Sequence, residues 1–135
     1  MAITFPSPEW LQTLFDKLNS DERYAQIARK WEGDMCVVIE PSGPLIEQHI
    51  YYLDLWHGKC RKTEILKDLS SVKSKFVLTA TYENISHIMK GELDPMQAMM
   101  TRKLQVHGSM AYMMRNVPTV LDFVRCCREV TTEIL

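Results

Sequence analysis

Histidine and cysteine are the side chains in this sequence that could bind a metal ion or act as nucleophiles. His57 and Cys60 are separated by two residues, a gap that is typical of metal ligands. A zinc site needs a second pair of ligands at a similar spacing, and the sequence has none. We therefore interpret His57 and Cys60 as turn residues beside Gly58, and we predict no metal site.

The adjacent cysteines Cys126 and Cys127 have basic neighbours in Arg125 and Arg128. A positive charge can lower the pKa of a thiol and make it nucleophilic, but packing on one face of a helix explains this pair more simply. Adjacent residues on a helix point about 100° apart, so the two thiols are poorly placed to form a disulfide. We interpret the four cysteines as reduced thiols, which predicts a cytoplasmic protein.

Motifs for covalent or phosphate chemistry are absent from the sequence. It contains no G-x-S-x-G elbow, no Walker loop and no G-x-G-x-x-G, and its five glycines are scattered. Its carboxylates form no acid–base pair, and Asp94 is better explained as a helix cap. We predict that the protein is not an enzyme, that it has no catalytic residue and that it needs no cofactor.

Methionine has the most uneven distribution of any residue type in the chain. Six of the nine methionines lie between Pro95 and Arg115. They form two triplets with the spacing i, i+3, i+4, namely Met96, Met99 and Met100, then Met110, Met113 and Met114. This spacing predicts two helical turns with a methionine face. Such a face can fill a solid core, or it can line a cavity that accepts ligands of varied shape.

The elements that must position these residues alternate in an α+β order. Helix start signals occur at Ser7-Pro8, Asp21, Thr81, Asp94-Pro95 and Ser109, and the last helix begins near Val117-Pro118. Strand patterns occur within residues 35–40, 47–60, 75–81 and 103–108, and the second of these strands is expected to end at His57-Gly58. The polar stretch 59–74 contains at most one helical turn, near Ile65–Leu69. We expect an antiparallel sheet with helices gathered on one face.

Length and charge exclude several classes of protein. The chain has 135 residues, of which 46% are hydrophobic, and this predicts one domain over residues 1–135. Its net charge is −1 and its basic residues are dispersed, so we predict no nucleic-acid partner. We also expect no signal peptide and no membrane-spanning helix. The sequence makes no prediction of oligomeric state.

The stretch from Phe76 to Arg115 resembles the C-terminal half of the sterol carrier protein-2 (SCP-2) domain. It shares with that family a strand, a short helix ending in Met-x-Gly, an Asp-Pro helix start and a Lys-Leu-x-Val-x-Gly strand. The matching residues are Met89, Gly91, Asp94, Pro95, Ala98, Met99, Met100, Lys103, Leu104, Val106 and Gly108. The resemblance implies a five-stranded, mostly antiparallel sheet covered by helices, which together enclose an apolar tunnel.

The sequence departs from this family pattern in two places that concern the ligand. Thr101-Arg102 replaces a Gln-Gly pair that family members often carry, and methionines replace an aromatic pair that often follows the proline. The charged residue could narrow the tunnel or pair with an acidic ligand head. Since only four strands are evident, the fifth must come from splitting residues 46–60 or from residues 60–63.

The resemblance implies non-catalytic binding and transfer of an amphiphilic lipid, such as a fatty acid, a fatty acyl-CoA or a sterol-like molecule. Periodicity and resemblance together predict a tunnel lined by Phe76, Leu78, Met89, Met96, Met99, Met100, Met113, Met114, Leu121 and Val124. Thr101 and Arg102 are predicted to meet the polar head group. The expected partners are this lipid and, transiently, a membrane. The alternative is an accessory module whose solid core packs on a partner protein.

Overall fold

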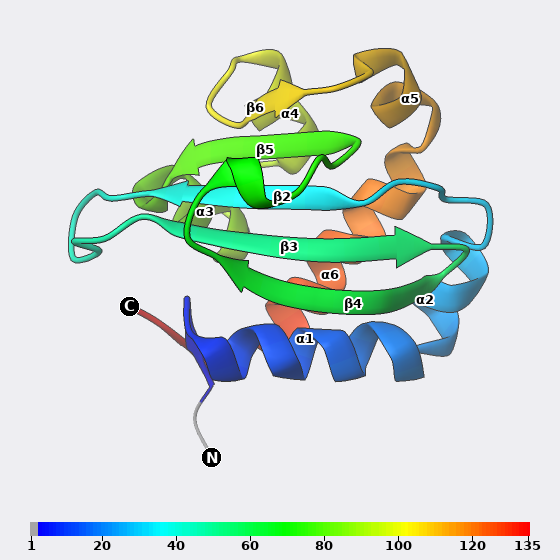
Figure 1. Ribbon diagram of the computed structural model, residues 1–135, viewed down its shortest axis with the longest axis horizontal. Helices are drawn as coiled ribbons and strands as arrows, with labels where there is room; N and C mark the ends of the chain where they lie inside the picture. Colours follow the sequence, from blue (N-terminus) through cyan, green and yellow to red (C-terminus); the bar gives the residue numbers. More distant parts are fainter. Residues whose placement is uncertain (1–2) are drawn as a thin grey trace.

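The computed structural model describes residues 3–135, which form a sheet layer and a helical layer. The strands are β1 (Thr4–Phe5), β2 (Met35–Glu40), β3 (His49–Trp56), β4 (Lys59–Leu66), β5 (Phe76–Thr81), β6 (Gln105–His107) and β7 (Glu133–Ile134). The helices are α1 (Pro8–Ser20), α2 (Glu22–Ile27), α3 (Tyr82–Met89), α4 (Pro95–Met100), α5 (Met110–Arg115), α6 (Val117–Val130) and a short 3-10 helix, η1 (Leu69–Ser71). Figure 1 shows α6 crossing behind the sheet and α1 running beside β4.

The main sheet has five strands in the order β4-β3-β2-β5-β6. β2 and β5 are parallel, whereas β4 with β3, β3 with β2, and β5 with β6 are antiparallel. The chain reaches β5 from β2 only after it has passed through β3, β4 and η1, so the parallel pair depends on a long crossover. The predicted α+β fold with a five-stranded, mostly antiparallel sheet is confirmed.

The turn between β3 and β4 shows where the fifth strand comes from. Its two residues, His57 and Gly58, have φ values of 49° and 79°, and positive φ at both central residues is typical of a type I′ hairpin turn. The strand predicted within residues 47–60 was expected to end at His57-Gly58, and β3 ends at Trp56, directly before this turn. The alternative that placed the fifth strand at residues 60–63 is closer, because β4 begins at Lys59.

β4 also corrects the interpretation of the polar stretch 59–74, because the strand forms the first half of this stretch. β4 continues to Leu66, and the 3-10 helix begins only at Leu69, so the helical turn expected near Ile65–Leu69 is displaced. Most side chains of β4 are exposed, because it is the edge strand of the sheet. Edge strands commonly carry charged side chains, and these obscured the strand pattern in the sequence.

Five helices begin at the residues that the sequence predicts. The side-chain oxygens of Ser7, Asp21, Thr81, Asp94 and Ser109 each accept a hydrogen bond from the backbone N–H three residues later. Each such cap stabilises its helix by about 1 kcal/mol. The last helix, α6, begins at Val117 as expected, without a side-chain cap.

The two faces of the sheet are covered differently. The helical layer packs on one face and forms the main core with alternate residues of β2, β3 and β5. The other face has a smaller apolar cluster of Cys36, Val38, Ile50 and Leu66, against which Val72 packs. Val72 follows η1, and Figure 1 shows the segment from β4 to β5 crossing this face. Both faces of the central strands are therefore covered.

An ion-pair network fixes α6 to the junction between α1 and α2. The Arg125 guanidinium donates to Asp21 at 2.7 Å, to Asp122 at 2.7 Å and to Glu129 at 2.9 Å. Hydrogen bonds from Arg125 and from the Tyr24 backbone N–H hold the pKa of the Asp21 carboxyl well below its usual range. The Asp122 side chain is 3% exposed, and its carboxylate forms ion pairs with Arg125 and Arg23.

Candidate functional site

An apolar cavity lies between the helical layer and the face of the sheet that this layer covers. Its volume is about 100 Å³, and the surface that its walls expose is wholly apolar. A single water molecule needs roughly 10–15 Å³ of such space, so the cavity could hold several water-sized groups. The interior is therefore hollow at this place rather than close-packed.

The sheet supplies one wall of the cavity through the alternation of its side chains. Val37 and Ile39 of β2, Leu53 and Leu55 of β3, and Leu78 of β5 point to the same face and line the cavity. The intervening residues of these strands point to the opposite face, where Cys36 and Val38 belong to the smaller cluster.

The helices supply the opposite wall, and methionine is prominent in it. Met89 ends α3, Met99 lies in α4 and Met113 lies in α5, and all three side chains are buried against the cavity. Val120 and Val124 of α6 lie one helical turn apart and complete this side. The predicted tunnel residues that line the cavity are Leu78, Met89, Met99, Met113 and Val124.

Phe76 is buried, but the structure places it in an aromatic cluster instead of the cavity wall. Its ring lies 5.6 Å from the ring of Trp31 and 5.8 Å from that of Tyr112. Gly33 and Gly108 allow backbone to approach this ring, because an added Cβ would lie 2.9 Å and 2.7 Å from its atoms. The prediction that Phe76 lines the tunnel is therefore not reproduced in this structure.

Three other predicted tunnel residues point outward. Met100 is 72% exposed, Met114 is 39% exposed and Leu121 is 40% exposed. Each directly follows or precedes a residue that faces the interior, and adjacent residues on a helix point about 100° apart. Met96 is half-buried against the core, but it does not line the cavity. The structure thus corrects the helical phase that the sequence reading assigned to these side chains.

The sequence reading also missed the part of the cavity wall that comes from the N-terminal half. Trp10 and Leu14 of α1, Tyr24 of α2, Tyr51 of β3, and Trp31 between α2 and β2 all line the cavity. The apolar stripe of α1 and the run of large residues in β3 were visible in the sequence. Only the tertiary fold shows that they face the methionines across the interior.

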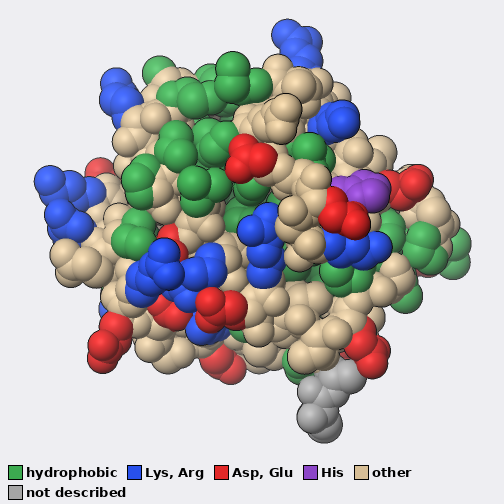
Figure 2. All heavy atoms as spheres, turned by 180° about the vertical axis from the view of Figure 1, so that it is seen from behind, with side chains coloured by type: hydrophobic (Ala, Val, Ile, Leu, Met, Phe, Trp, Pro, Cys, Tyr) green, Lys and Arg blue, Asp and Glu red, His purple; other side chains and the backbone are tan. Residues whose placement is uncertain are grey.

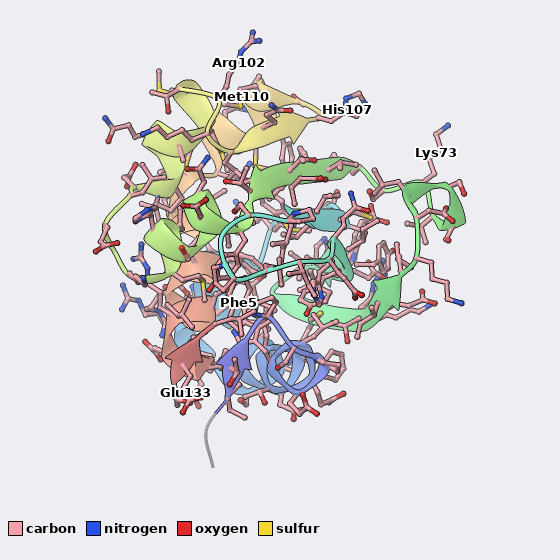
Figure 3. All side chains as sticks on the ribbon, turned by 90° about the vertical axis from the view of Figure 1, so that its left-hand side faces the viewer. Phe5, Lys73, Arg102, His107, Met110 and Glu133 are labelled. Atoms are coloured by element: carbon pink, nitrogen blue, oxygen red, sulfur yellow. The ribbon has the colours of Figure 1, made fainter. Side chains whose placement is uncertain are left out.

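A second, open pocket lies on the outer side of Met99. It is lined by Met99, Arg102, Gln105, Val106 and Met110, and its volume is about 480 Å³. Met99 lines both this outer pocket and the internal cavity. Figure 3 shows Arg102 and Met110 together at one end of the molecule, with the Arg102 side chain extending away from the protein.

The two residues predicted to meet a polar head group have different surroundings. The Thr101 hydroxyl donates to the Gln97 carbonyl oxygen at 2.9 Å, so it is already used within α4. Arg102 follows the helix with φ of 63°, and its side chain lines the outer pocket. The structure therefore places Arg102, and not Thr101, at a pocket that a ligand could occupy.

The thiols of this structure are poorly suited to nucleophilic chemistry. Burial raises the pKa of Cys60 to about 12 and that of Cys126 to about 11, and burial also raises the pKa of Cys127. A protonated thiol is a weak nucleophile and a weak metal ligand. Cys127 lines the cavity as an apolar wall residue. These environments do not activate any of the three thiols.

The side chains whose types or spacing resemble those of metal ligands have other partners in this structure. His57 Nε2 lies 2.6 Å from a Glu32 carboxylate oxygen, whereas the Cys60 thiol donates to the Lys62 carbonyl oxygen at 3.5 Å. The two side chains thus have separate partners. His57 lies in the β3–β4 turn as interpreted, whereas Cys60 lies in β4 and not in the turn. Asp21, Asp122 and Cys126 also lie close together, but the Arg125 guanidinium already binds both carboxylates.

Comparison with known proteins places this fold in one family. Residues 11–120 match the SCP-2 sterol transfer family. No curated protein matches the chain by sequence. Within residues 3–135, no helix combines the length and the apolar character that crossing a membrane requires.

Solved structures of similar proteins cover nearly the whole chain. A crystal structure of sterol carrier protein 2 is 27% identical, covers 93% of this chain and 98% of its own, and has a TM-score of 0.83. A solution structure of a conserved hypothetical protein from Thermus thermophilus, described as possibly a sterol carrier protein, is 27% identical over 93% of this chain and 88% of its own, with a TM-score of 0.82.

A more distant likeness concerns the fold alone. The solution structure of palmitated SCP2L2 from Aedes aegypti is 16% identical over 85% of this chain and 94% of its own, with a TM-score of 0.59. The family match covers most of the sequence and includes the five-stranded sheet and the methionines of the cavity wall. The chain therefore belongs to the SCP-2 sterol transfer family.

Proposed function

We propose that this protein binds an amphiphilic lipid, such as a fatty acid, a fatty acyl-CoA or a sterol-like molecule, and transfers it without covalent chemistry. The observation that carries the proposal is the wholly apolar cavity behind the sheet. Membership of a family described by sterol transfer supports it. The palmitated relative from Aedes aegypti, though distant, supports a fatty acid as one candidate ligand.

Burying a long acyl chain in an apolar interior provides enough free energy for binding. Each buried methylene contributes about 0.8 kcal/mol, so a sixteen-carbon chain contributes about 12 kcal/mol before costs. The entropy lost when the acyl chain and the protein become ordered removes part of this binding free energy. A remainder of about 8 kcal/mol corresponds to a micromolar Kd. No catalytic group is needed for this activity, and the protonated thiols described above supply none.

Binding of a long chain requires the walls to move apart. Small-molecule pockets commonly measure roughly 300–1,000 Å³, whereas the internal cavity measures about 100 Å³. Methionine is unbranched and has several rotamers, so Met89, Met99 and Met113 can adjust with little strain. We infer that the cavity widens around its ligand, chiefly on the helical side.

Exposed apolar side chains support transient contact with a membrane during transfer. Met100, Met114 and Leu121 are exposed on α4, α5 and α6, the helices that carry the outer pocket or the cavity wall. Figure 2, a view from behind the sheet, shows hydrophobic side chains gathered on the side where α5 lies. A lipid leaving the cavity near these residues could pass directly into a bilayer. The four cysteines are free, which supports action in the cytoplasm.

A cavity-filling substitution tests the proposal. Val120 lines the cavity, so Val120→Phe should fill part of the space and weaken palmitate binding by about tenfold or more. Leu121→Phe is the matched control, because it places the same side chain at the adjacent residue, which points outward. Palmitate titration measured by calorimetry gives the affinities, and circular dichroism checks that both variants are folded.

Several outcomes would contradict the carrier. A flat wild-type titration at tens of micromolar palmitate, palmitoyl-CoA and cholesterol, with no lipid adduct in native mass spectrometry, would favour the accessory module. Equal weakening by Val120→Phe and Leu121→Phe would show that the lipid binds outside the cavity. If Val120→Phe does not fold, Leu78→Phe repeats the test from the sheet side of the cavity.

A further inference from the structure

The outer pocket and the internal cavity share one lining residue, Met99. Met99 lines both spaces, is 5% exposed and lies in α4. Its rotation about its side-chain bonds would connect the two spaces without a change in the backbone. A ligand that extends from the cavity past Met99 would place its end among the residues of the outer pocket.

Arg102 is the charged residue among those that line the outer pocket. The other lining residues, Met99, Gln105, Val106 and Met110, are neutral. Within residues 3–135, no carboxylate lies within ion-pair distance of the Arg102 guanidinium. Figure 3 shows its side chain extended at one end of the molecule. The guanidinium is thus available to an anion, whose oxygens it can bind through two parallel N–H donors.

The backbone at Arg102 provides an independent observation. Its φ of 63° lies in the left-handed region, which costs an L-residue about 1–2 kcal/mol and costs glycine almost nothing. The turn is needed locally, because it lets the Leu104 N–H donate to the Ala98 carbonyl oxygen at 3.0 Å. A glycine would adopt this turn with less strain. The stability of the turn therefore does not explain an arginine at this position, whereas its place in the outer pocket does.

We propose that the outer pocket is an anionic head-group site, in which Arg102 pairs with a carboxylate or phosphate while a single apolar chain passes Met99 into the cavity. This inference rests on the proposed function and narrows its ligand class to anionic single-chain amphiphiles. The protein then prefers such ligands to neutral amphiphiles of equal chain length. The Arg102 side chain lines this outer pocket at one end of the molecule.

The test compares ligands that share a sixteen-carbon chain and differ in the head group. Palmitate, hexadecyl phosphate and hexadecanol are titrated into wild type, Arg102→Gln and Lys103→Gln. Lys103 is the matched control, since it is the next residue, is exposed and does not line the pocket. Because exposed ion pairs are weak, we expect Arg102→Gln to weaken the anionic ligands about two- to fivefold and to leave hexadecanol unchanged.

The remaining expected results follow from the same contact. Lys103→Gln should preserve the preference of the protein for anions. Raising the salt concentration should reduce that preference wherever Arg102 is present, and should have no such effect on Arg102→Gln. Palmitate and hexadecyl phosphate distinguish the two sources of anionic charge. The one whose affinity falls more in Arg102→Gln identifies the head group that the site binds.

Two results would overturn the inference in distinguishable ways. If all three amphiphiles bind, but Arg102→Gln weakens them equally or matches Lys103→Gln, the head-group site is wrong and the carrier stands. If none of them binds wild type, both proposals fail.

Arg102→Gly provides a further check: it should retain wild-type resistance to urea or exceed it, and lose the anion preference. A loss of stability would show that the arginine has a structural role.

Discussion

At the scale of single residues, neighbouring side chains of the same type have opposite surroundings. Met99 is 5% exposed and lines both the cavity and the outer pocket, whereas Met100 is 72% exposed. The sequence predicted that this segment is helical and apolar, and both statements hold. Which methionine faces inward depends on how α4 packs against α6, and that contact involves residues farther along the chain.

Asp21 gives a prediction about pH at this scale. Its folded pKa lies below the ordinary value of 3.8, chiefly because Arg125 donates to it. The unfolded state therefore binds a proton at higher pH than the folded state does. The carboxylate stabilises the fold above about pH 4, and this stabilisation decreases as the pH falls toward the folded pKa.

Asp21→Asn removes this titration and keeps a side chain that can cap α2. We expect wild type to be more stable than the variant at pH 6 and this difference to shrink steadily below about pH 4. Urea unfolding of both proteins between about pH 2 and 6 measures it. A difference in the free energy of unfolding that stays constant across this range would contradict the assigned role of Asp21.

At the scale of elements, the parts of the fold that depend on local contacts were predictable. Helix starts at Ser7, Thr81, Asp94 and Ser109 follow from a cap and its own backbone three residues later. The turn at His57-Gly58 was predicted, but the sequence left open which residues form the next strand, because β4 is an edge strand with mostly exposed side chains. The parallel pairing of β2 with β5 was equally hidden, because it joins segments separated by a hairpin.

The β3–β4 turn supplies a prediction for an element. Gly58 and Gly91 have φ of 79° and 80°, so alanine is strained equally at both. At Gly58 an added Cβ would also lie 2.6 Å from the Ala25 carbonyl oxygen, whereas at Gly91 nothing lies within 4 Å. We expect Gly91→Ala to cost about 1 kcal/mol and Gly58→Ala to cost clearly more, because α2 must move.

Thermal and urea unfolding of the two alanine variants measure this difference. Gly91→Ala is the control for Gly58→Ala, since the φ angle is nearly the same at both positions and only the space around the new methyl group differs. Equal destabilisation would mean that α2 does not press on the turn in solution. A larger cost at Gly91 would contradict the packing described for both positions.

At the scale of the whole molecule, the methionine-lined cavity wall and the outer pocket lie close to exposed apolar groups on α4, α5 and α6. The sequence predicted the family, the sheet and much of the methionine wall. It could not predict the outer pocket, because the residues that line it become neighbours only when α4, β6 and α5 fold back along the sheet edge.

The exposed apolar groups predict how the molecule meets a bilayer. Replacing Met100, Met114 and Leu121 together with glutamine should lower the partition coefficient onto phosphatidylcholine vesicles, measured by co-sedimentation, by about a hundredfold, because partly burying each side chain in lipid contributes roughly 1 kcal/mol. The matched control replaces three other exposed apolar residues, Ile46, Ile65 and Leu69. Equal losses in the two triple variants would contradict a defined membrane face.

β1 and β7, the first and last strands of the described residues, lie side by side because they pair in parallel. Figure 1 shows this strand pair (dark blue and dark red) at the lower left, far from β6 and α4 at the top. A fluorescent reporter, a surface tether or a second protein fused to either end would therefore stay clear of the outer pocket. The same proximity would let a short linker join the ends, so that new termini could be opened in an exposed loop elsewhere.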